Sequence, residues 1–155
     1  MQGDLFANFT PDEPGEAKKS NLETLESLTY NYQLIDTEEK RRKIIQKLLT
    51  SKILSLDTET TGTEPMDAEL VGMSFSIAEN EAFYVPVPSD QDKALKIVNE
   101  FRPVFENENS LKVGQNIKYD MIVLQNYGAV VKGPLFDTMI AHYVLQPELR
   151  HGMDY

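Results

Sequence analysis

A chain of 155 residues, 41% of them hydrophobic, suits one domain with a buried core, and it has no apolar run of 18 residues that could span a membrane. Without cysteine it has neither a disulfide scaffold nor a Cys-based zinc site, as is usual for a cytoplasmic protein. Its net charge of −10 argues against a module that grips long nucleic acid, because such domains are usually basic. It does not argue against an enzyme that handles a few nucleotides and uses metal ions to offset its own carboxylates.

Residues 1–28 are polar and acidic without a clear period, and we expect a linker or disordered lead-in there, followed by one domain over residues 29–155. Residues 30–35 have the composition of a short strand. Asp36, with Glu39 three residues later, predicts the start of a helix that ends near Leu49. Three closely spaced segments then predict antiparallel strands. They cover residues 52–58, 69–77 and 82–87.

The second half of the chain alternates helices with short strands. Apolar residues at helical spacing predict three helices, the first kinked or restarted at Pro103, the second ended by Gly128 and the third capped by Asp137. These helices cover residues 92–105, 117–127 and 136–145, and short strands are expected at residues 111–114 and 130–131. The order of elements predicts an α/β fold, with a mixed sheet and helices on its faces.

Two carboxylates follow an apolar strand at Leu56-Asp57-Thr58-Glu59-Thr60. Residues i and i+2 of a strand point to one face, so Asp57 and Glu59 should project together. Two like charges at this distance repel each other and call for a cation or a shared proton, and oxygen ligands of this kind suit Mg²⁺ or Mn²⁺. The alternative is a pair of solvated acids in a turn.

A second polar cluster runs from strand to turn to helix at Val113–Asp120. Gln115 and Asn116 lie at the helix entrance, where backbone N–H groups favour anions. Asp120 lies one turn further on. The structural alternative is that Asn116 is an N-cap and that Asp120 is a favourable acid in the first turn.

In this order the two clusters resemble a known family. Asp57-Thr58-Glu59 is similar to the first motif of the four-carboxylate exonucleases, whose fold is ribonuclease H-like. Asn116-Ile117-Lys118-Tyr119-Asp120 is similar to the second motif, as found in the proofreading 3′→5′ exonuclease domain of bacterial DNA polymerase I, a family A polymerase. The similarity spans roughly residues 30–155 and includes Leu70–Phe75, Lys112–Asn116, Phe136–Met139 and Arg150–Asp154.

The resemblance implies a role for each site residue. Asp57 would bridge two divalent cations, Mg²⁺ or Mn²⁺, with Glu59 on the first and Asp120 on the second through water. The single-stranded 3′ end of DNA would be contacted by Gln115, Asn116 and Tyr119, and Arg150 would reach a phosphate. Thr63 stands where the family usually has a Leu that wedges against the terminal bases, which puts the apolar wedge in doubt.

The family also implies a third motif, Tyr-x-x-x-Asp, on a later helix. The formal match at Tyr32–Asp36 precedes the first motif and begins on an expected strand, so we reject it. The motif should lie beyond Tyr155, and we therefore expect a fragment of the domain, truncated at its C-terminus and almost inactive alone.

The implied function is proofreading in DNA replication and repair. The 3′-terminal phosphodiester of DNA would be hydrolysed to release nucleoside monophosphates, with a polymerase domain in the same full-length chain. Two alternatives remain open. One is a catalytically decayed scaffold domain of a family A polymerase, and the other is an RNA-processing exonuclease of the same superfamily.

Overall fold

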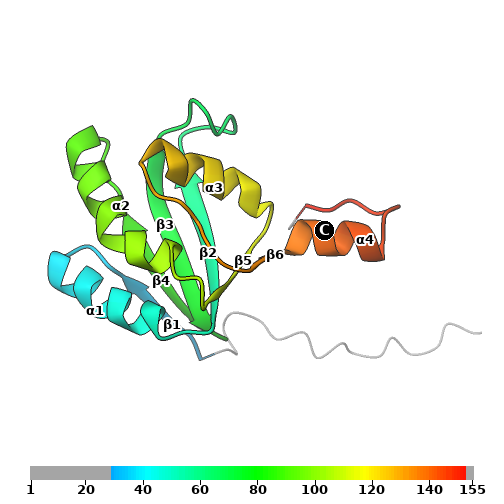
Figure 1. Cartoon of the computed structure of the whole chain (residues 1–155), viewed down its shortest axis with the longest axis horizontal. Coiled ribbons are helices and arrows are strands. Elements are labelled where there is room, and N and C mark those ends of the chain that lie inside the picture. The colour runs from blue at the N-terminus through cyan, green and yellow to red at the C-terminus, as the bar shows by residue number, and fades with distance from the viewer. Residues whose placement is uncertain (1–28, 153–155) are drawn as a thin grey trace, which may run out of the picture.

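The computed structural model describes residues 29–152 (Figure 1), so the expected lead-in of residues 1–28 and the motif residues Met153 and Asp154 lie outside the described part. Six strands and four helices alternate along it. In chain order they are β1 (Asn31–Leu34), α1 (Glu38–Leu49), β2 (Ile53–Thr60), β3 (Leu70–Ala78), β4 (Glu81–Pro86), α2 (Gln91–Phe105), β5 (Leu111–Gly114), α3 (Ile117–Asn126), β6 (Leu135–Asp137) and α4 (Thr138–Leu145). No helix in this range is both long and apolar enough to cross a bilayer.

All six strands form one mixed sheet in the order β1-β4-β3-β2-β5-β6. As predicted, β2, β3 and β4 are antiparallel neighbours. The two edges are parallel, because β1 pairs with β4 on one side while β5 and β6 extend the sheet beyond β2 on the other. The predicted α/β class is confirmed.

One face of the sheet is covered by helices and carries the core. Alternate residues of the central strands point into it, such as Leu56 of β2, Phe75 of β3 and Val85 of β4, each at most 3% exposed. Buried side chains of α1, α2 and α3 join them in a single hydrophobic cluster. The ring of Phe75 stacks on that of Phe101 from α2, with 5.3 Å between the centroids.

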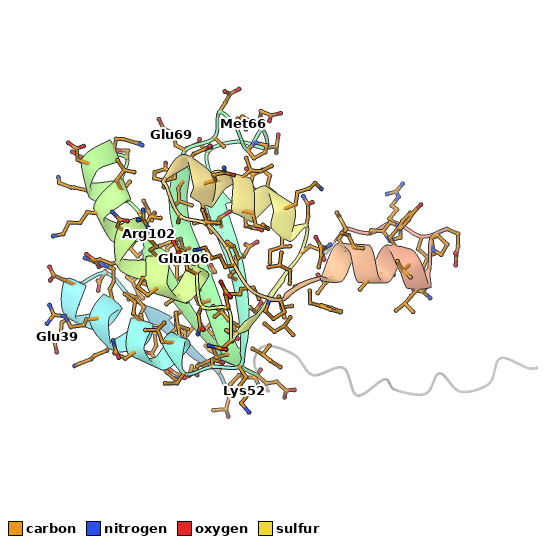
Figure 2. All side chains as sticks on the ribbon, in the orientation of Figure 1. Glu39, Lys52, Met66, Glu69, Arg102 and Glu106 are labelled. Carbon is orange, nitrogen blue, oxygen red and sulfur yellow. The ribbon has the colours of Figure 1, made fainter. Side chains whose placement is uncertain are left out.

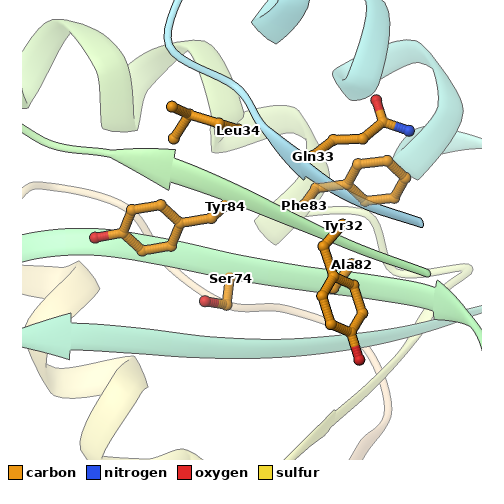
Figure 3. A pocket seen from close by; sticks show the side chains of 7 residues that line it. All are labelled: Tyr32, Gln33, Leu34, Ser74, Ala82, Phe83 and Tyr84. Carbon is orange, nitrogen blue, oxygen red and sulfur yellow. The ribbon is translucent and has the colours of Figure 1, made fainter. Parts of the chain in front are cut away.

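The other residues of the same strands form what we call the open face, which no helix covers in the described structure. On β2 it comprises Ile53, Ser55, Asp57 and Glu59, all exposed. The strand registers place the following residues on the same face: Ser74 and Ser76 of β3, Ala82 and Tyr84 of β4, and Tyr32 and Leu34 of β1. Figure 3 shows the hollow at its β1 edge, where the rings of Tyr32 and Tyr84 flank Ser74.

Several boundaries differ from the sequence prediction. The N-cap of α1 is Thr37, whose hydroxyl accepts from the Lys40 amide, whereas Asp36 forms an ion pair with Lys40. Helix α2 continues through Pro103, which lies exposed in its last turn. The predicted restart there is wrong, because the helix is continuous from Gln91 to Phe105. The kink at Pro103 stays a prediction.

The predicted strand at residues 130–131 is also wrong. Val131 is buried in the core, so its β-branched side chain marked burial rather than strand pairing. The strand that pairs with β5 is β6, and it includes Phe136, although the sequence predicts that residue in the following helix. Helix α4 begins at Thr138 with Asp137 as its N-cap, as predicted, and it projects from the body of the domain (Figure 1).

Candidate active site

Asp57 and Glu59 lie together on the open face near the end of β2. Leu56, which precedes Asp57, and Thr58, which lies between the two acids, point into the covered face. The alternation predicted from the sequence is therefore present. The sheet partly desolvates the carboxyl of Asp57, and this burial, together with the charge of Glu59, raises its pKa. The two carboxylates therefore repel each other, and a bound cation would offset this repulsion.

Asp120 lies beside this pair, where β2 and β5 separate. The last residue pair between the two strands joins Ser55 to Val113, so β2 continues past the end of β5. There Thr58 donates two hydrogen bonds to Asp120 Oδ1, from its backbone N–H at 2.8 Å and its hydroxyl at 2.6 Å. The carboxylate thus takes the place of a strand partner along this part of β2.

The environment of Asp120 favours its neutral form. The side chain is 2% exposed, and burial raises its pKa to about 6. The two hydrogen bonds from Thr58 act in the opposite direction, and the nearby charge of Asp57 adds to the increase. The electrostatic influence of Asp57 on Asp120 connects the two predicted motifs in space.

An open groove of about 510 Å³ adjoins Glu59, lined by residues 58–63 on one side and by Asn116 and Tyr119 of the second motif on the other. The Tyr119 hydroxyl lies 2.6 Å from both Gly62 O and Thr60 Oγ1, so it ties this segment to α3. The segment continues into the loop before β3, which carries Met66 and Glu69 (Figure 2). Glu59, Thr63, Asn116 and Tyr119 are therefore brought together.

Gln115 lies outside this groove, in an adjoining hollow that it shares with Asp57. Its side chain is held at both ends, by the hydroxyl of Thr138 and by the backbone carbonyl of His151 at 2.7 Å. Arg150 is exposed in the segment after α4, and within residues 29–152 it forms no ion pair. The structure does not bring Arg150 together with the carboxylates.

Two contributions were missed by sequence reasoning. Thr58 orients Asp120, and the available signal was a threonine at the inward position between two outward acids. Asn116 does not cap α3 with its side chain, contrary to the structural alternative; instead Asp137 accepts from the backbone N–H groups of Asn116 and Ile117. The anion expected at this helix entrance is thus supplied by the protein itself.

The donor set fits a hard cation. Asp57, Glu59 and Asp120 offer carboxylate oxygens, and none of the three takes part in an ion pair within the described residues. In the same range no three His, Cys, Asp or Glu side chains converge closely enough to hold a metal by themselves. Water or further ligands would have to complete the coordination of any cation bound here.

Residues 32–155 match the family described as 3′-5′ exonuclease. The chain belongs to this exonuclease family. It is 30% identical over 146 residues to DNA polymerase I of Borreliella burgdorferi, covering 92% of this chain and 16% of that protein. It is 33% identical over 163 residues to DNA polymerase I of Pseudomonas aeruginosa, covering 96% of this chain and 18% of that one. The chain thus spans less than a fifth of the length of these relatives.

Solved structures agree with this assignment at the level of the fold. The catalytic core of RRP6 from Trypanosoma brucei superposes with a TM-score of 0.63 at 24% identity, over 80% of this chain and 33% of that one. Brucella melitensis NrnC with bound Mg²⁺ gives 0.62 at 21% identity, over 81% and 58%. The predicted ribonuclease H-like fold is confirmed, and the family is one of nucleases.

Proposed function

We propose that this exonuclease domain acts on DNA, using two divalent cations, Mg²⁺ or Mn²⁺, to hydrolyse the 3′-terminal phosphodiester and release nucleoside monophosphates. One observation carries the proposal: Asp57, Glu59 and Asp120 gather at the end of β2 beside a groove lined by Asn116 and Tyr119. Unpaired carboxylates beside an open groove provide cation ligands next to space for a chain end.

The three carboxylates have different tasks in this proposal. Glu59 and Asp57 would hold the first cation on the open face, and Asp57 would also contribute to the second. Thr58 occupies Oδ1 of Asp120, so the other oxygen is the one available to the second cation or its water. When bound, the cations would supply a water of lowered pKa and stabilise charge on the attacking and leaving oxygens. The structural neighbour NrnC with bound Mg²⁺ supports the choice of metal.

We expect the groove to take a single strand rather than a duplex, because Asn116 and Tyr119 line it with an amide and an aromatic ring that unpaired bases can contact. Asn116 and Tyr119 offer an amide and a ring to the terminal nucleotides, and Thr63 lines the opposite wall without an apolar wedge. Gln115 would contact the substrate only after it releases Thr138 and the backbone of His151. For Arg150 a phosphate contact remains a prediction.

DNA is favoured over RNA by the relatives at 30% and 33% identity, which are DNA polymerases. The resulting role is proofreading in replication and repair in the cytoplasm, with a polymerase domain in the same full-length protein. A mispaired 3′ end frays more readily than a paired one, so it enters a single-strand site more often. A decayed scaffold is disfavoured, because all three carboxylates of the first two motifs are present.

The test follows a 5′-labelled single strand as it shortens from its 3′ end with Mg²⁺ or Mn²⁺, beside an RNA of the same sequence. We expect slow cleavage of DNA by the 155-residue chain and fast cleavage by a longer chain that carries the Tyr-x-x-x-Asp motif, because three carboxylates leave the first cation one ligand short. Asp57→Ala should slow both by on the order of a hundredfold, whereas the loop variant Glu64→Ala should not. Faster cleavage of RNA, or an inactive longer chain, would refute the proposal.

A further inference from the structure

One carboxylate, that of Asp137, caps the N-termini of two helices. As the N-cap of α4 it accepts from the backbone N–H groups of Met139 at 2.9 Å and Ile140 at 3.2 Å. It also accepts from the first N–H groups of α3, those of Asn116 at 3.1 Å and Ile117 at 3.0 Å. Asp137 is the last residue of β6 and pairs with Gly114 of β5, so the strand register brings it to the start of α3.

The contact with Asp137 coincides with an unusual backbone conformation at Asn116. Asn116 has a left-handed backbone, with φ 55° and ψ 43°, and Ile117 after it is helical. Successive left-handed and helical residues turn their N–H groups toward one point, which creates a small anion-binding concavity. Asp137 fills this concavity with its two oxygens, Oδ1 on one N–H and Oδ2 on the next.

The side chain of Asn116 is consequently released from capping. A residue at this position of a helix usually accepts from the helix backbone, and Asn116 does not. Its Oδ1 instead accepts from the Lys118 ammonium at 2.8 Å, and the side chain lines the groove that also contains Tyr119. The concavity is already occupied by a carboxylate, so a nucleic acid must be contacted through side chains rather than through these backbone groups.

We propose that Asp137 is a positioning residue for the substrate groove: it caps α3 from a neighbouring strand and thereby fixes Asn116 in the left-handed conformation that presents its amide to the terminal nucleotides. This inference rests on the proposed function for its substrate. Its structural half, the control of the Asn116 backbone by Asp137, can be tested without any nucleic acid.

The decisive variant is Asp137→Ser in the 155-residue chain. Serine is a good N-cap, so it keeps the cap of its own helix α4, but it is too short to reach the N–H groups of α3. The matched control is Asp90→Ser. Asp90 caps α2 by accepting from the Lys93 amide, and it lies outside the groove.

The first measurement is the NMR signature of a positive φ at Asn116, which is a strong intraresidue NOE between its amide and α protons. We expect this signature in the wild type and in Asp90→Ser and its loss in Asp137→Ser. The second is the dissociation constant for a labelled oligothymidylate at low salt. We expect Asp137→Ser to weaken binding about tenfold and Asp90→Ser to leave it unchanged, and Asn116→Ala to add nothing in the Asp137→Ser background.

A left-handed Asn116 in Asp137→Ser with wild-type affinity would overturn the inference, as would fully additive effects of the two substitutions. The failure of the proposed function has a different result. In that case neither Asn116→Ala nor Tyr119→Ala alters oligothymidylate binding, while the NMR signature still reports whether Asp137 controls Asn116. Binding that drops equally in Asp137→Ser and Asp90→Ser would reveal a general loss of stability and would also count against Asp137.

Discussion

The two faces of the central sheet are built from alternate residues of the same strands, yet they have different chemistry. On the covered face the inward residues of β2, β3 and β4 are almost entirely apolar and buried. On the open face the same strands carry serines, Tyr84 and the acids Asp57 and Glu59. A change of one position along a strand thus exchanges a packing residue for a candidate catalytic one.

The comparison separates stability from chemistry. Burial of apolar side chains on the covered face is the main favourable contribution to the free energy of folding. It offsets the unfavourable free energy of keeping carboxylates close together elsewhere in the domain. The open face contributes little burial, and its two carboxylates, Asp57 and Glu59, form no ion pair within the described residues. Asp120 is the exception, since it lies at the edge between the faces, buried like a core residue and charged like a site residue. Variants on either face, and at this edge, test whether the division holds.

The largest effect is expected on the covered face of β3. Phe75→Ala removes a ring that packs on Phe101 and Phe105, and it should lower the free energy of unfolding by about 3–5 kcal/mol. Its neighbour Ser74 points to the open face, so Ser74→Ala should change the free energy by less than about 0.5 kcal/mol. Urea unfolding of both variants measures the difference. Similar losses in the two would show that the open face is packed as tightly as the core.

Asp120 should destabilise the metal-free protein at neutral pH. Its pKa is about 6 when folded and near 4 when unfolded, so the folded state binds the proton more tightly. The contribution of Asp120 to stability should therefore fall as the pH rises from about 4 to about 6 and then level off, with a total cost of up to about 3 kcal/mol. Asp120→Asn keeps an acceptor for Thr58 without the charge, so it should be more stable than the wild type at pH 7.5 but not at pH 4.

The measurement is urea unfolding of both proteins in EDTA at several pH values. Asp90→Asn serves as the control, because Asp90 is exposed and caps a helix on the surface. A wild type whose stability relative to Asp120→Asn rises between pH 4 and 6, or an Asp120→Asn protein that is weaker at pH 7.5, would show that the buried carboxyl is stabilised as an anion.

On the open face, Asp57→Ala should leave stability nearly unchanged and reduce nuclease activity by on the order of a hundredfold, which is about 2.7 kcal/mol of barrier. It should also abolish the paramagnetic broadening that Mn²⁺ is expected to cause near β2, since Asp57 and Glu59 are the proposed ligands. The control is Glu69→Ala in the loop before β3 (Figure 2). Equal broadening in wild type and Asp57→Ala would show that the cation binds elsewhere.

Much of this division could be predicted from local sequence. The alternation around Asp57 and Glu59 requires only the two-residue period of a strand, and Gly128, with φ 75°, ends α3 as expected. Contacts that depend on the sheet register could not be predicted in this way. Asp137 reaches Asn116 because β5 and β6 are parallel neighbours, and the three-residue β6 is too short to leave a periodic signal. Thr58 was overlooked because its partner Asp120 is 62 residues away.

Gly72 illustrates the same limit on the open face. It is opposite Glu59 in the sheet, and a Cβ there would overlap the ring of Tyr84, which lies across it. The sequence contains the glycine but does not indicate that a tyrosine from the next strand requires the space. Long-range packing of this kind determines which open-face side chains lie near the carboxylates.

The smallest effect is expected at Tyr119, where the groove meets α3. Tyr119→Phe keeps the ring and removes the hydroxyl that lies 2.6 Å from Gly62 O and Thr60 Oγ1. Losing these contacts should cost about 1 kcal/mol of stability and weaken single-stranded DNA binding by about threefold to fivefold, because the groove wall is held less firmly. The wild type should bind a single strand more tightly than a blunt duplex of equal length, and fluorescence anisotropy measures both.

The control is Tyr32→Phe, since Tyr32 is a residue 58% exposed on the edge strand β1, and it should change neither quantity. Tighter binding of the duplex would count against a single-strand groove. Unchanged affinity in Tyr119→Phe, together with a lower stability, would show instead that the tyrosine serves the fold alone.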